Sequence, residues 1–498
     1  SGDWSSDVCS SDLSFKLKNC LAHALNVDFC FNRWFGHIFH RSLMPHSLSV
    51  HQNILNHNQN HLLDNLCRLS LDQKNDYEQE LFELDLVLLE ELFSQTQNTA
   101  ASTEGEITPL DFELALENPK YSQWLQKGEE LIAQGAVGAF LVAGGQGSRL
   151  GFDGPKGIYS IDLPSQKSLF QLQAERLLNL EKRYGRPIPW CIMTSPLNHQ
   201  ATVDFFENHN FFGLNPGLVK FFPQSMIPAL DVNGKILRSG PANLALVPDG
   251  NGGCFRALAQ SGALDWFSSF GVEYVFLNSV DNALVKVCDP AFMGALALED
   301  SLSASKVVSK ANAQEKVGIF AYHNGNPMVI EYSDLDTQMR EATQGDKLVY
   351  DGANIAVHAF SMKALRQLEA HPLPWHNAFK KVDFWDPQQG FVKPEAPNAW
   401  KFEQFLFDAF PLLGQMLAYG VLRNSEFAPV KNATGDDSPA SARKLLGQLH
   451  RQWLQEAGGQ INDALLYEIA PELSYGGENL NAEKIAAAMG QSILSFSG

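Results

Sequence analysis

The chain has 498 residues, a hydrophobic content of 45% and a formal net charge of −19. This length and apolar content suffice for a large buried core and predict two or three domains rather than one. The negative charge disfavours a broad nucleic-acid surface, because such surfaces place many Lys and Arg side chains against phosphates. The longest apolar runs, such as residues 136–143, are far shorter than the roughly 20 residues of a membrane helix, so no spanning segment is expected.

Residues 1–43 differ in character from the rest of the chain. The stretch DWSSDVCSSDL at 3–13 looks like one reading frame of a sequencing-adapter oligonucleotide, and residues 14–43 have no clear helical or strand period. We therefore expect this segment to be non-native, with Met44 as a natural start. The alternative is a disordered or cleaved leader, although the uninterrupted apolar core of a signal peptide is missing from it.

The cysteines outside this segment are few and scattered. They are Cys67, Cys191, Cys254 and Cys288, and no two of them have CxxC spacing. Neither a zinc site nor a disulfide framework is predicted, and a reducing, cytoplasmic compartment is the simplest expectation.

The amino-terminal part of the chain is expected to be helical. Residues 76–93 place Leu81, Leu84 and Leu88 at helical spacing, with acids on the other face. This pattern predicts one amphipathic helix. We expect residues 44–130 as a whole to form a helical amino-terminal domain.

From about residue 131 apolar strands alternate with amphipathic helices. Strands are predicted at 135–143, 188–195, 219–224 and 272–280, and helices at 167–183, 198–210 and 289–300. Ser168 and Gln171 occupy capping-box positions, and Asp289 precedes Pro290 as the cap of the last helix. The alternation predicts an α/β fold with a mostly parallel sheet and helices on both faces.

Two β-rich stretches interrupt the alternation. Residues 227–237 and 317–334 each carry an Asn-Gly turn between apolar flanks, which predicts hairpins. We expect them to form flaps over the edge of the sheet. The catalytic core is assigned to residues 131–433, and residues 434–498 are expected to form a small carboxyl-terminal domain of helices and loops.

The glycine-rich stretch LVAGGQGSRLG at 141–151 follows the first of these strands. A P-loop requires Lys and Ser or Thr after its last glycine, but Phe152 follows Gly151, and the spacing of a dinucleotide-binding loop fails at Leu150. A tight turn with free backbone N–H groups remains, followed by two cations, Arg149 and Lys156. Such a set suits a triphosphate under attack; the alternative is a structural turn with solvated basic side chains.

Two further loops follow extended segments. VPDGNGG at 247–253 has three glycines, a more flexible backbone than a connection needs, which favours a ligand-binding loop. The alternative is a long turn. Asp281 follows an apolar strand, where a carboxylate is suited to hold Mg²⁺ against phosphates, unless it only caps a helix. Because ligands of such sheets bind beyond the carboxyl ends of the strands, these loops should converge on one site.

A series of motifs occurs in one order along the chain: LVAGGQGSRLG, SLFQLQAER, IMTSPLNH, VPDGNGG, SVDNALVKVCDP, KVGIF, VIEYSDL, ANIAVHAF, KFEQFLFDAF and EFAPVKNA. As a set it closely resembles the eukaryotic-type UDP-N-acetylglucosamine pyrophosphorylases, from about residue 76 to the carboxyl end. Gln146 in the GGQGxRLG form is typical of this family, whereas UDP-glucose and broad-specificity UDP-sugar pyrophosphorylases tend to carry Leu there.

The resemblance implies a Rossmann-like nucleotidyltransferase core of the GT-A-like type. It implies a uridylyltransferase: UTP and N-acetylglucosamine 1-phosphate react, with Mg²⁺, to UDP-N-acetylglucosamine and pyrophosphate by in-line attack on the α-phosphorus. It further implies a cytoplasmic monomer or homodimer without nucleic-acid or membrane partners. Two alternatives stay open: a UDP-sugar pyrophosphorylase acting on N-acetylgalactosamine, glucose or galactose 1-phosphate, and a non-catalytic UDP-sugar sensor.

The resemblance also assigns roles to individual residues. Those expected to bind the nucleotide are Val142, Ala143, Gly144, Gly145, Gln224, Gly250, Asp281 and Lys401, with Asp281 also meeting the metal. Those expected to neutralise the reacting phosphates are Arg149, Lys156 and Lys431. Those expected to bind the acetamido sugar are Asn251, Glu331, Tyr332, Asn354, Phe405 and Phe407.

The chain departs from the family pattern in two places near these residues. The family's KxEKF reads KFEQF, with Gln404 in place of a lysine, which leaves Lys401 but weakens any role for the second position. Cys254 stands where relatives usually have a bulkier apolar residue.

Overall fold

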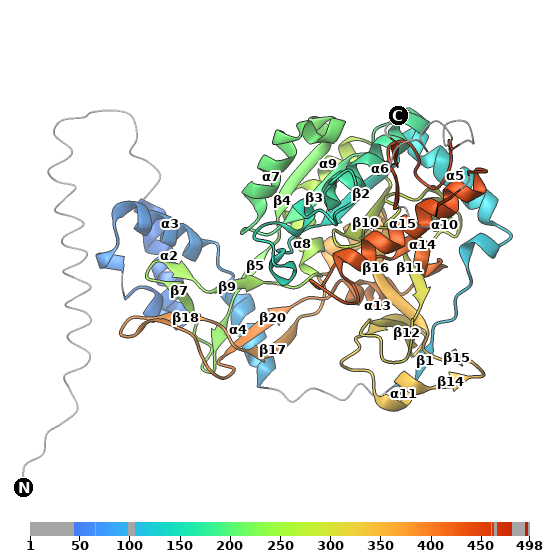
Figure 1. Ribbon diagram of the computed structural model, residues 1–498. Helices are drawn as coiled ribbons and strands as arrows, with labels where there is room; N and C mark the ends of the chain where they lie inside the picture. Colours follow the sequence, from blue (N-terminus) through green and yellow to red (C-terminus); the bar gives the residue numbers. More distant parts are fainter. Residues whose placement is uncertain are drawn as a thin grey trace, which may run out of the picture. The chain divides into compact units, whose positions relative to one another are not determined.

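The structure is a computed structural model that describes residues 44–64, 66–97, 105–459, 461–462, 466–480 and 494–496 (Figure 1). The predictions made for residues 1–43 lie outside the described residues. In the described part of the chain, no helix is long and apolar enough to cross a membrane.

The chain forms two units, which we name by their main content. The amino-terminal unit combines the chain up to residue 100 with 227–247 and 377–402, and the sheet unit comprises 101–226, 248–376 and 403–498. The division predicted from the sequence was linear, and it did not anticipate that two later segments group with the first helices. Its boundaries stay a prediction.

Helices and short strands make up the amino-terminal unit. Its helices are α2 (Met44–Asn56), α3 (Leu71–Phe82) and α4 (Leu86–Thr96). Its strands are β6 (Leu230–Asp231), β7 (Arg238–Gly240), β8 (Asn243–Leu244), β18 (Phe384–Asp386) and β19 (Gly390–Val392). The chain passes between the units in β5 (Met226–Pro228), β9 (Leu246–Pro248), β17 (His376–Lys380) and β20 (Ala399–Glu403).

The single helix predicted over residues 76–93 is wrong. The chain leaves α3 at Glu83, and α4 starts after Asp85, whose side chain accepts a hydrogen bond from the Leu88 amide at 3.0 Å. An aspartate that satisfies a free amide at a helix start is more stable there than inside a helix. The leucine spacing spans both helices, so periodicity alone does not reveal the break.

A ten-stranded sheet is the centre of the sheet unit, with the order β1-β12-β16-β10-β2-β3-β4 and three strands off this path. The strands on the path are β1 (Ile107–Pro109), β12 (Ile319–His323), β16 (Gly352–Ser361), β10 (Tyr274–Ser279), β2 (Val137–Val142), β3 (Trp190–Thr194) and β4 (Val219–Pro223). Off it lie β11 (Ser303–Ser309), β13 (Asn326–Ile330) and β21 (Leu417–Gly420). The pairs β10-β2, β2-β3 and β3-β4 are parallel, whereas β16 pairs antiparallel with its neighbours. The predicted α/β class with a mostly parallel sheet is confirmed, and the parallel pairs form its centre.

The two predicted hairpins belong to different units of the chain. β12 and β13 pair antiparallel around a turn in which Asn324 and Gly325 both have positive φ, as an Asn-Gly turn requires. This hairpin is part of the main sheet and not a flap over it. The other Asn-Gly turn closes a bridge between Leu230 and Ile236 and belongs to the amino-terminal unit.

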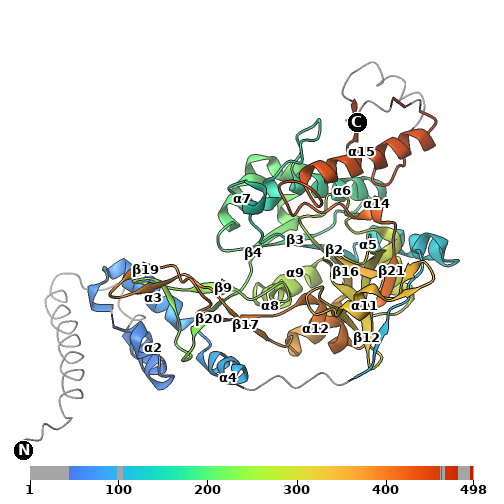
Figure 2. The ribbon, with the colours of Figure 1, turned by 60° about the horizontal axis from the view of Figure 1, so that its bottom comes forward.

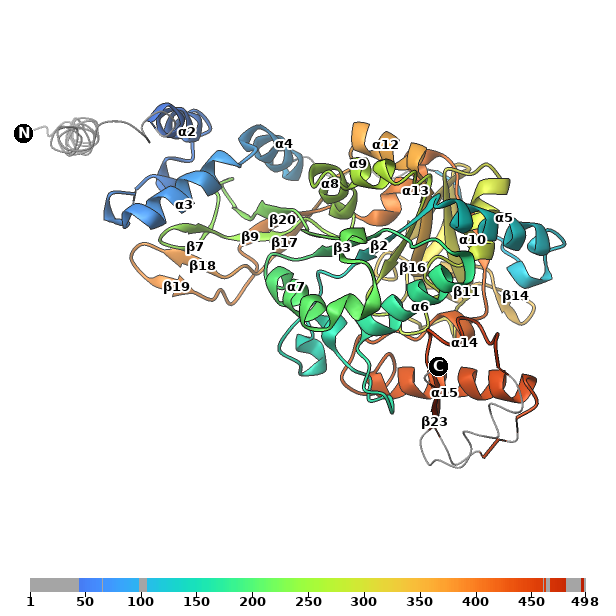
Figure 3. The ribbon, with the colours of Figure 1, turned by 90° about the horizontal axis from the view of Figure 1, so that it is seen from above.

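Helices cover both faces of the sheet (Figure 3). One face packs against α8 (Gly253–Gln260), α9 (Ala263–Ser269), α12 (Met362–Ala370) and α13 (Ala409–Leu413). The other packs against α5 (Tyr121–Gln134), α6 (Leu169–Tyr184), α7 (His199–Asn208), α10 (Pro290–Leu298) and α15 (Pro439–Glu456). Shorter elements are α11 (Thr337–Glu341), α14 (Arg423–Glu426), β14 (Thr343–Gln344) and β15 (Lys347–Leu348).

Two predicted caps can be checked. Asp289 caps α10, with Pro290 at its first position, as expected. Ser168 caps α6 by accepting from the Gln171 amide, but the Gln171 side chain donates to Glu175 at 3.0 Å and not back to the cap. One half of the predicted capping box is therefore observed.

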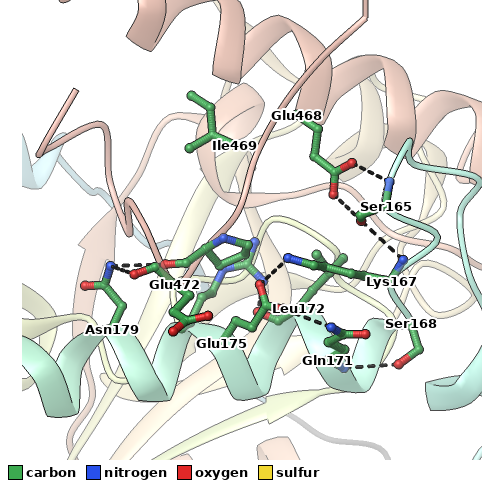
Figure 4. A network of polar contacts seen from close by, with 12 residues as sticks. Ser165, Lys167, Ser168, Gln171, Leu172, Glu175, Asn179, Glu468, Ile469 and Glu472 are labelled. Carbon is green, nitrogen blue, oxygen red and sulfur yellow. Dashed lines mark hydrogen bonds and ion pairs between the residues drawn. The ribbon is translucent and has the colours of Figure 1, made fainter. Parts of the chain in front are cut away.

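The carboxyl-terminal residues pack on α6 (Figure 2). After α15, the strand β22 (Tyr467–Ile469) pairs with β23 (Leu494–Phe496). The Asn179 side chain of α6 donates to the carbonyls of Pro471 and Glu472, each at 3.1 Å, and Glu468 accepts from Ser165 just before α6 (Figure 4). These contacts brace the helix that follows the phosphate loop.

Candidate functional site

The predicted phosphate loop leaves β2 at Val142 and folds back on itself. The Gly147 amide donates to Gly154 at 2.9 Å and the Lys156 amide donates to Gly145 at 3.1 Å. This closure keeps Lys156, half-buried, on the same loop as the exposed Arg149. Val142, Ala143, Gly144 and Gly145 form the strand-to-loop turn, as predicted from the sequence.

Asn198 holds this turn from behind, a role that the sequence analysis did not assign. Its buried side chain donates to the carbonyls of Ala143, at 3.1 Å, and Gly145, at 3.3 Å, while its oxygen accepts from Ser195. By engaging these carbonyls it fixes the orientation of the turn. The signal was present in the IMTSPLNH motif, but only the fold shows that the asparagine meets the glycine loop.

Gln224 and Gly144 lie against each other at the ends of β4 and β2. The Gln224 amide donates to Thr194 at 2.7 Å, and a β-carbon added at Gly144 would lie 2.5 Å from the Gln224 side-chain oxygen. Only glycine therefore leaves this side chain in place. The structure brings the predicted uracil-binding Gln224 to the phosphate loop.

The DGNGG turn has a backbone that requires glycine. Gly250 has φ of +86°, and a β-carbon on it would lie 2.3 Å from the Gln404 carbonyl oxygen. Gln404 in turn donates its amide to Asp249, accepts from Gly252, and buries a side chain that donates to Leu373 at 2.7 Å. The residue that replaces the family's lysine is thus a buried brace of the turn.

Asp249, at the start of the same turn, is fully buried. Burial raises the pKa of its carboxyl, and the Arg256 guanidinium at 2.7 Å opposes that rise. Arg256 also lies over the Trp375 ring, 5.1 Å from its centroid. This pair anchors the start of α8 beneath the turn.

The predicted sugar residues from two distant segments meet at the turn. The Asn251 side-chain oxygen accepts from the Leu406 amide at 2.9 Å, which places Asn251 beside the FLF segment. Phe405 and Phe407 stack, with ring centroids 5.1 Å apart. Both rings are partly exposed, so they are accessible to a ligand.

Glu331 and Asn354 form a second part of the predicted sugar end, and Lys431, predicted to act on the phosphates, lies near Glu331. Burial raises the pKa of Glu331, Asp334 adds to the rise, and Lys431 opposes it, which places Lys431 within electrostatic range. The Asn354 amide donates to Gly318 at 2.9 Å, next to Glu331 across the hairpin. Tyr332 follows Glu331 and is 45% exposed.

The backbone of Asp281 is bound to that of Val430, the residue before Lys431. The Val430 amide donates to the Asp281 carbonyl at 2.9 Å. The neighbouring Asn282 accepts from the Ala428 amide at 2.9 Å and donates to the Glu426 carbonyl at 2.7 Å. The loop after β10 and the segment 426–431 therefore form one layer that carries both predicted phosphate ligands.

A buried ion network lies beneath this layer. Lys306, with no exposed side-chain area, contacts Asp289 at 2.7 Å and Glu426 at 3.0 Å, and Glu426 also contacts Lys286 at 3.4 Å. Burial alone would raise the pKa of Asp289, but the two lysines hold it below its usual value. Sequence patterns gave no signal for this network, because its members come from separate segments.

Lys401 belongs to β20 in the amino-terminal unit and is half-buried. Its predicted role at the phosphates stays a prediction.

Asp281 fits Mg²⁺ as a single carboxylate ligand that acts together with substrate phosphates. Among the described residues, no group of three or more His, Cys, Asp and Glu side chains forms a metal cage. Mg²⁺ bound with nucleotides typically uses one or two carboxylates plus substrate phosphates. Asp281 at the end of β10 provides such a carboxylate, and the charge of Asp437 lies within electrostatic range.

Comparison with known proteins agrees with this geometry. The family described as UTP–glucose-1-phosphate uridylyltransferase (UDPGP) matches residues 87–471. The chain belongs to this family. It is 40% identical over 404 residues to the UDP-N-acetylglucosamine pyrophosphorylase of Saccharomyces cerevisiae, covering 78% of this chain and 85% of that one. It is 42% identical over 386 residues to the UDP-N-acetylglucosamine diphosphorylase 2 of Arabidopsis thaliana, covering 72% and 75%.

Solved structures confirm the predicted nucleotidyltransferase fold of this UDPGP chain. The uridine diphosphate N-acetylglucosamine pyrophosphorylase from Trypanosoma brucei, in complex with an inhibitor, matches with a TM-score of 0.76 at 25% identity. That match covers 92% of this chain and 99% of the other. A putative UDP-N-acetylglucosamine pyrophosphorylase from Entamoeba histolytica matches with a TM-score of 0.70 at 30% identity, covering 79% and 99%.

Proposed function

We propose that the protein joins UTP and N-acetylglucosamine 1-phosphate to UDP-N-acetylglucosamine and pyrophosphate. The observations that carry the proposal are two contacts within the sheet unit: Gln224 lies against Gly144 of the phosphate loop, and the DGNGG turn binds the segment of Phe405 and Phe407 through Asn251 and Leu406. The names of the yeast and plant relatives, at 40% and 42% identity, support this activity.

The reaction is a direct displacement. An oxygen of the sugar phosphate attacks the α-phosphorus of UTP, a new P–O bond forms, and the bond to the β-phosphate oxygen breaks, so that pyrophosphate leaves. No covalent enzyme intermediate is required, and catalysis consists of positioning and charge neutralisation. Arg149 and Lys156 on the phosphate loop neutralise the triphosphate and leaving group, while Lys431 meets the attacking phosphate.

The remaining residues orient the two substrates. The turn Val142–Gly145 cradles the nucleotide, and Gln224 and Gly250 contact the uracil. Asn251, Glu331, Tyr332 and Asn354 bind the sugar, and Phe405 and Phe407 line the N-acetyl pocket. Lys401 reaches a phosphate oxygen of the nucleotide.

Mg²⁺ belongs to the same proposal, with Asp281 as its protein ligand. When bound, the ion supplies positive charge beside the phosphates. We extend the proposal to a cytoplasmic monomer or homodimer without nucleic-acid or membrane partners.

The test is pyrophosphate release by the full chain from UTP and Mg²⁺ with N-acetylglucosamine, N-acetylgalactosamine, glucose and galactose 1-phosphates. Turnover with the N-acetylated sugars supports the proposal. Faster turnover with glucose or galactose 1-phosphate would support the broader UDP-sugar enzyme. Absence of turnover with all four, alongside measurable binding of UDP-N-acetylglucosamine, would identify a sensor.

A further inference from the structure

A third ring extends the Phe405/Phe407 pair. The His376 ring centroid lies 4.8 Å from that of Phe405, at an interplanar angle of 42°. Its side chain is 46% exposed, so the ring is partly open to solvent. His376 is not among the residues assigned to the sugar by the family resemblance.

His376 is also tied to the turn that carries both phenylalanines. Its Nε2 atom lies 2.8 Å from Oδ2 of Asp408, whose side chain is only 16% exposed. The Asp408 amide donates to the Phe405 carbonyl at 3.0 Å and closes this turn. Imidazole and carboxylate therefore hold the turn on one side, and the hydrogen bond between Asn251 and Leu406 holds it on the other.

The position of His376 along the chain gives this contact a second role. His376 is the last residue of the sheet unit before the excursion 377–402, and the chain returns to that unit at Glu403, just before Phe405. The ion pair thus joins the two strands of backbone where the excursion begins and ends. A contact that closes the loop formed by residues 377–402 limits the conformational freedom of the turn that carries Phe405 and Phe407.

We infer that His376 is a positioning residue for sugar-phosphate recognition, which fixes Phe405 through its contacts with that ring and with Asp408. The inference rests on the proposed function, because it takes Phe405 and Phe407 as the N-acetyl pocket. It adds a residue that acts on the sugar substrate and not on UTP.

The charges around His376 give the contact a pH dependence. Asp408 raises the pKa of His376, burial opposes it, and Asp334 and Glu403 add to the rise. In the part of the chain that the structure describes, these three carboxylates carry the charges that act on the imidazole, and all favour its protonated form. The ion pair is therefore complete at acidic pH and is lost as pH rises through the elevated pKa of His376.

The experiment compares His376→Ala and Asp408→Asn with a matched control, His371→Ala, in the full chain. His371 is exposed and lies in the same connection, but not at the turn. KM is measured separately for N-acetylglucosamine 1-phosphate and for UTP. We expect KM for the sugar phosphate to rise about tenfold in both variants, the size of one charge-assisted hydrogen bond, with KM for UTP unchanged and the control like the wild type.

Two further readouts separate positioning from a general structural effect. The KM ratio of His376→Ala to wild type should fall as pH rises through the elevated pKa of His376, because the wild type loses the same ion pair there. In calorimetry the variant should lose affinity for UDP-N-acetylglucosamine but not for UDP. Equal loss for both ligands, or an unchanged sugar-phosphate KM, would overturn the inference. Lack of turnover by the wild type would instead refute the proposed function, and the calorimetric comparison would still test His376.

Discussion

The two ends of the proposed site, one for the nucleotide and one for the sugar, are built differently. At the nucleotide end, backbone makes the site: a β-carbon at Gly144 or Gly250 would collide with a neighbour, and Asn198 fixes the loop through carbonyls. At the sugar end, partly exposed side chains make it, with the rings of Phe405, Phe407 and His376 in contact.

This difference predicts different responses to change. Replacing a glycine at positive φ has a large effect or almost none, because an added side chain either fits or forces the loop to move. Where side chains line a pocket, the loss of binding free energy is proportional to the contact area and the hydrogen bonds that are removed. The nucleotide end should therefore lose rate when it is altered, and the sugar end should lose affinity.

The substitution with the largest expected effect tests whether the nucleotide end also depends on the buried ion network beneath it. Glu426→Gln removes the carboxylate that contacts the half-buried Lys286 and leaves the buried Lys306 with Asp289 alone. We expect a loss of about 3–5 kcal/mol in the free energy of unfolding, as for other broken buried ion pairs. Denaturant unfolding measures it; a loss below about 1 kcal/mol, within the range of an exposed pair, would show that the network does not support the layer.

Arg149→Ala tests charge neutralisation at the same end. Arg149 is exposed, so its loss should leave the fold intact. If it stabilises charge in the transition state, kcat should fall on the order of 10²–10³-fold while affinity for UDP-N-acetylglucosamine changes little. Equal losses in rate and affinity would reduce Arg149 to a binding residue.

Gly250→Ala tests the role of backbone directly. The new methyl group would lie 2.3 Å from the Gln404 carbonyl oxygen, so the turn must move. A displacement of this kind should lower kcat/KM about 10²-fold. Gly185→Ala is the control, since Gly185 has φ of +72° but no atom within 4 Å of an added β-carbon. Similar losses in both variants would attribute the effect to φ alone.

Phe407→Ala should have the smallest effect of the series. It removes one ring from the stacked pair, while the hydrogen bonds of Asn251 and Asp408 still hold the turn. We expect about a tenfold rise in KM for N-acetylglucosamine 1-phosphate, with kcat nearly unchanged, consistent with a loss of roughly 1–1.5 kcal/mol from an aromatic contact. A fall in kcat with constant KM would contradict the division between the two ends.

The sequence predicted those structures that depend on neighbouring residues. The glycine loop after β2, the turn of β12 and β13 and the Asp289 cap each depend on neighbouring residues, and each is observed. Asn198, Gln404 and His376 were not predicted as site supports, because each acts through partners distant in sequence. The helix break at Asp85 was hidden by a leucine spacing that continues across it.

The amino-terminal unit shows the same limit on a larger scale. Residues 227–247 and 377–402 have short β-rich patterns that give no indication of where they pack. Apolar alternation predicts that a strand exists, whereas the choice of partner depends on the whole chain. Lys401 lies in one of these segments, which is why its predicted role depends most on experiment.

The most direct test of the account is a competition between substrates. The full chain is given UTP, Mg²⁺ and equal concentrations of N-acetylglucosamine 1-phosphate and glucose 1-phosphate, and the two UDP-sugars are quantified by mass spectrometry at low conversion. The proposed function predicts that UDP-N-acetylglucosamine dominates on the order of tenfold or more, the discrimination that a fitted N-acetyl pocket provides. UDP-glucose in equal or greater amount would contradict it.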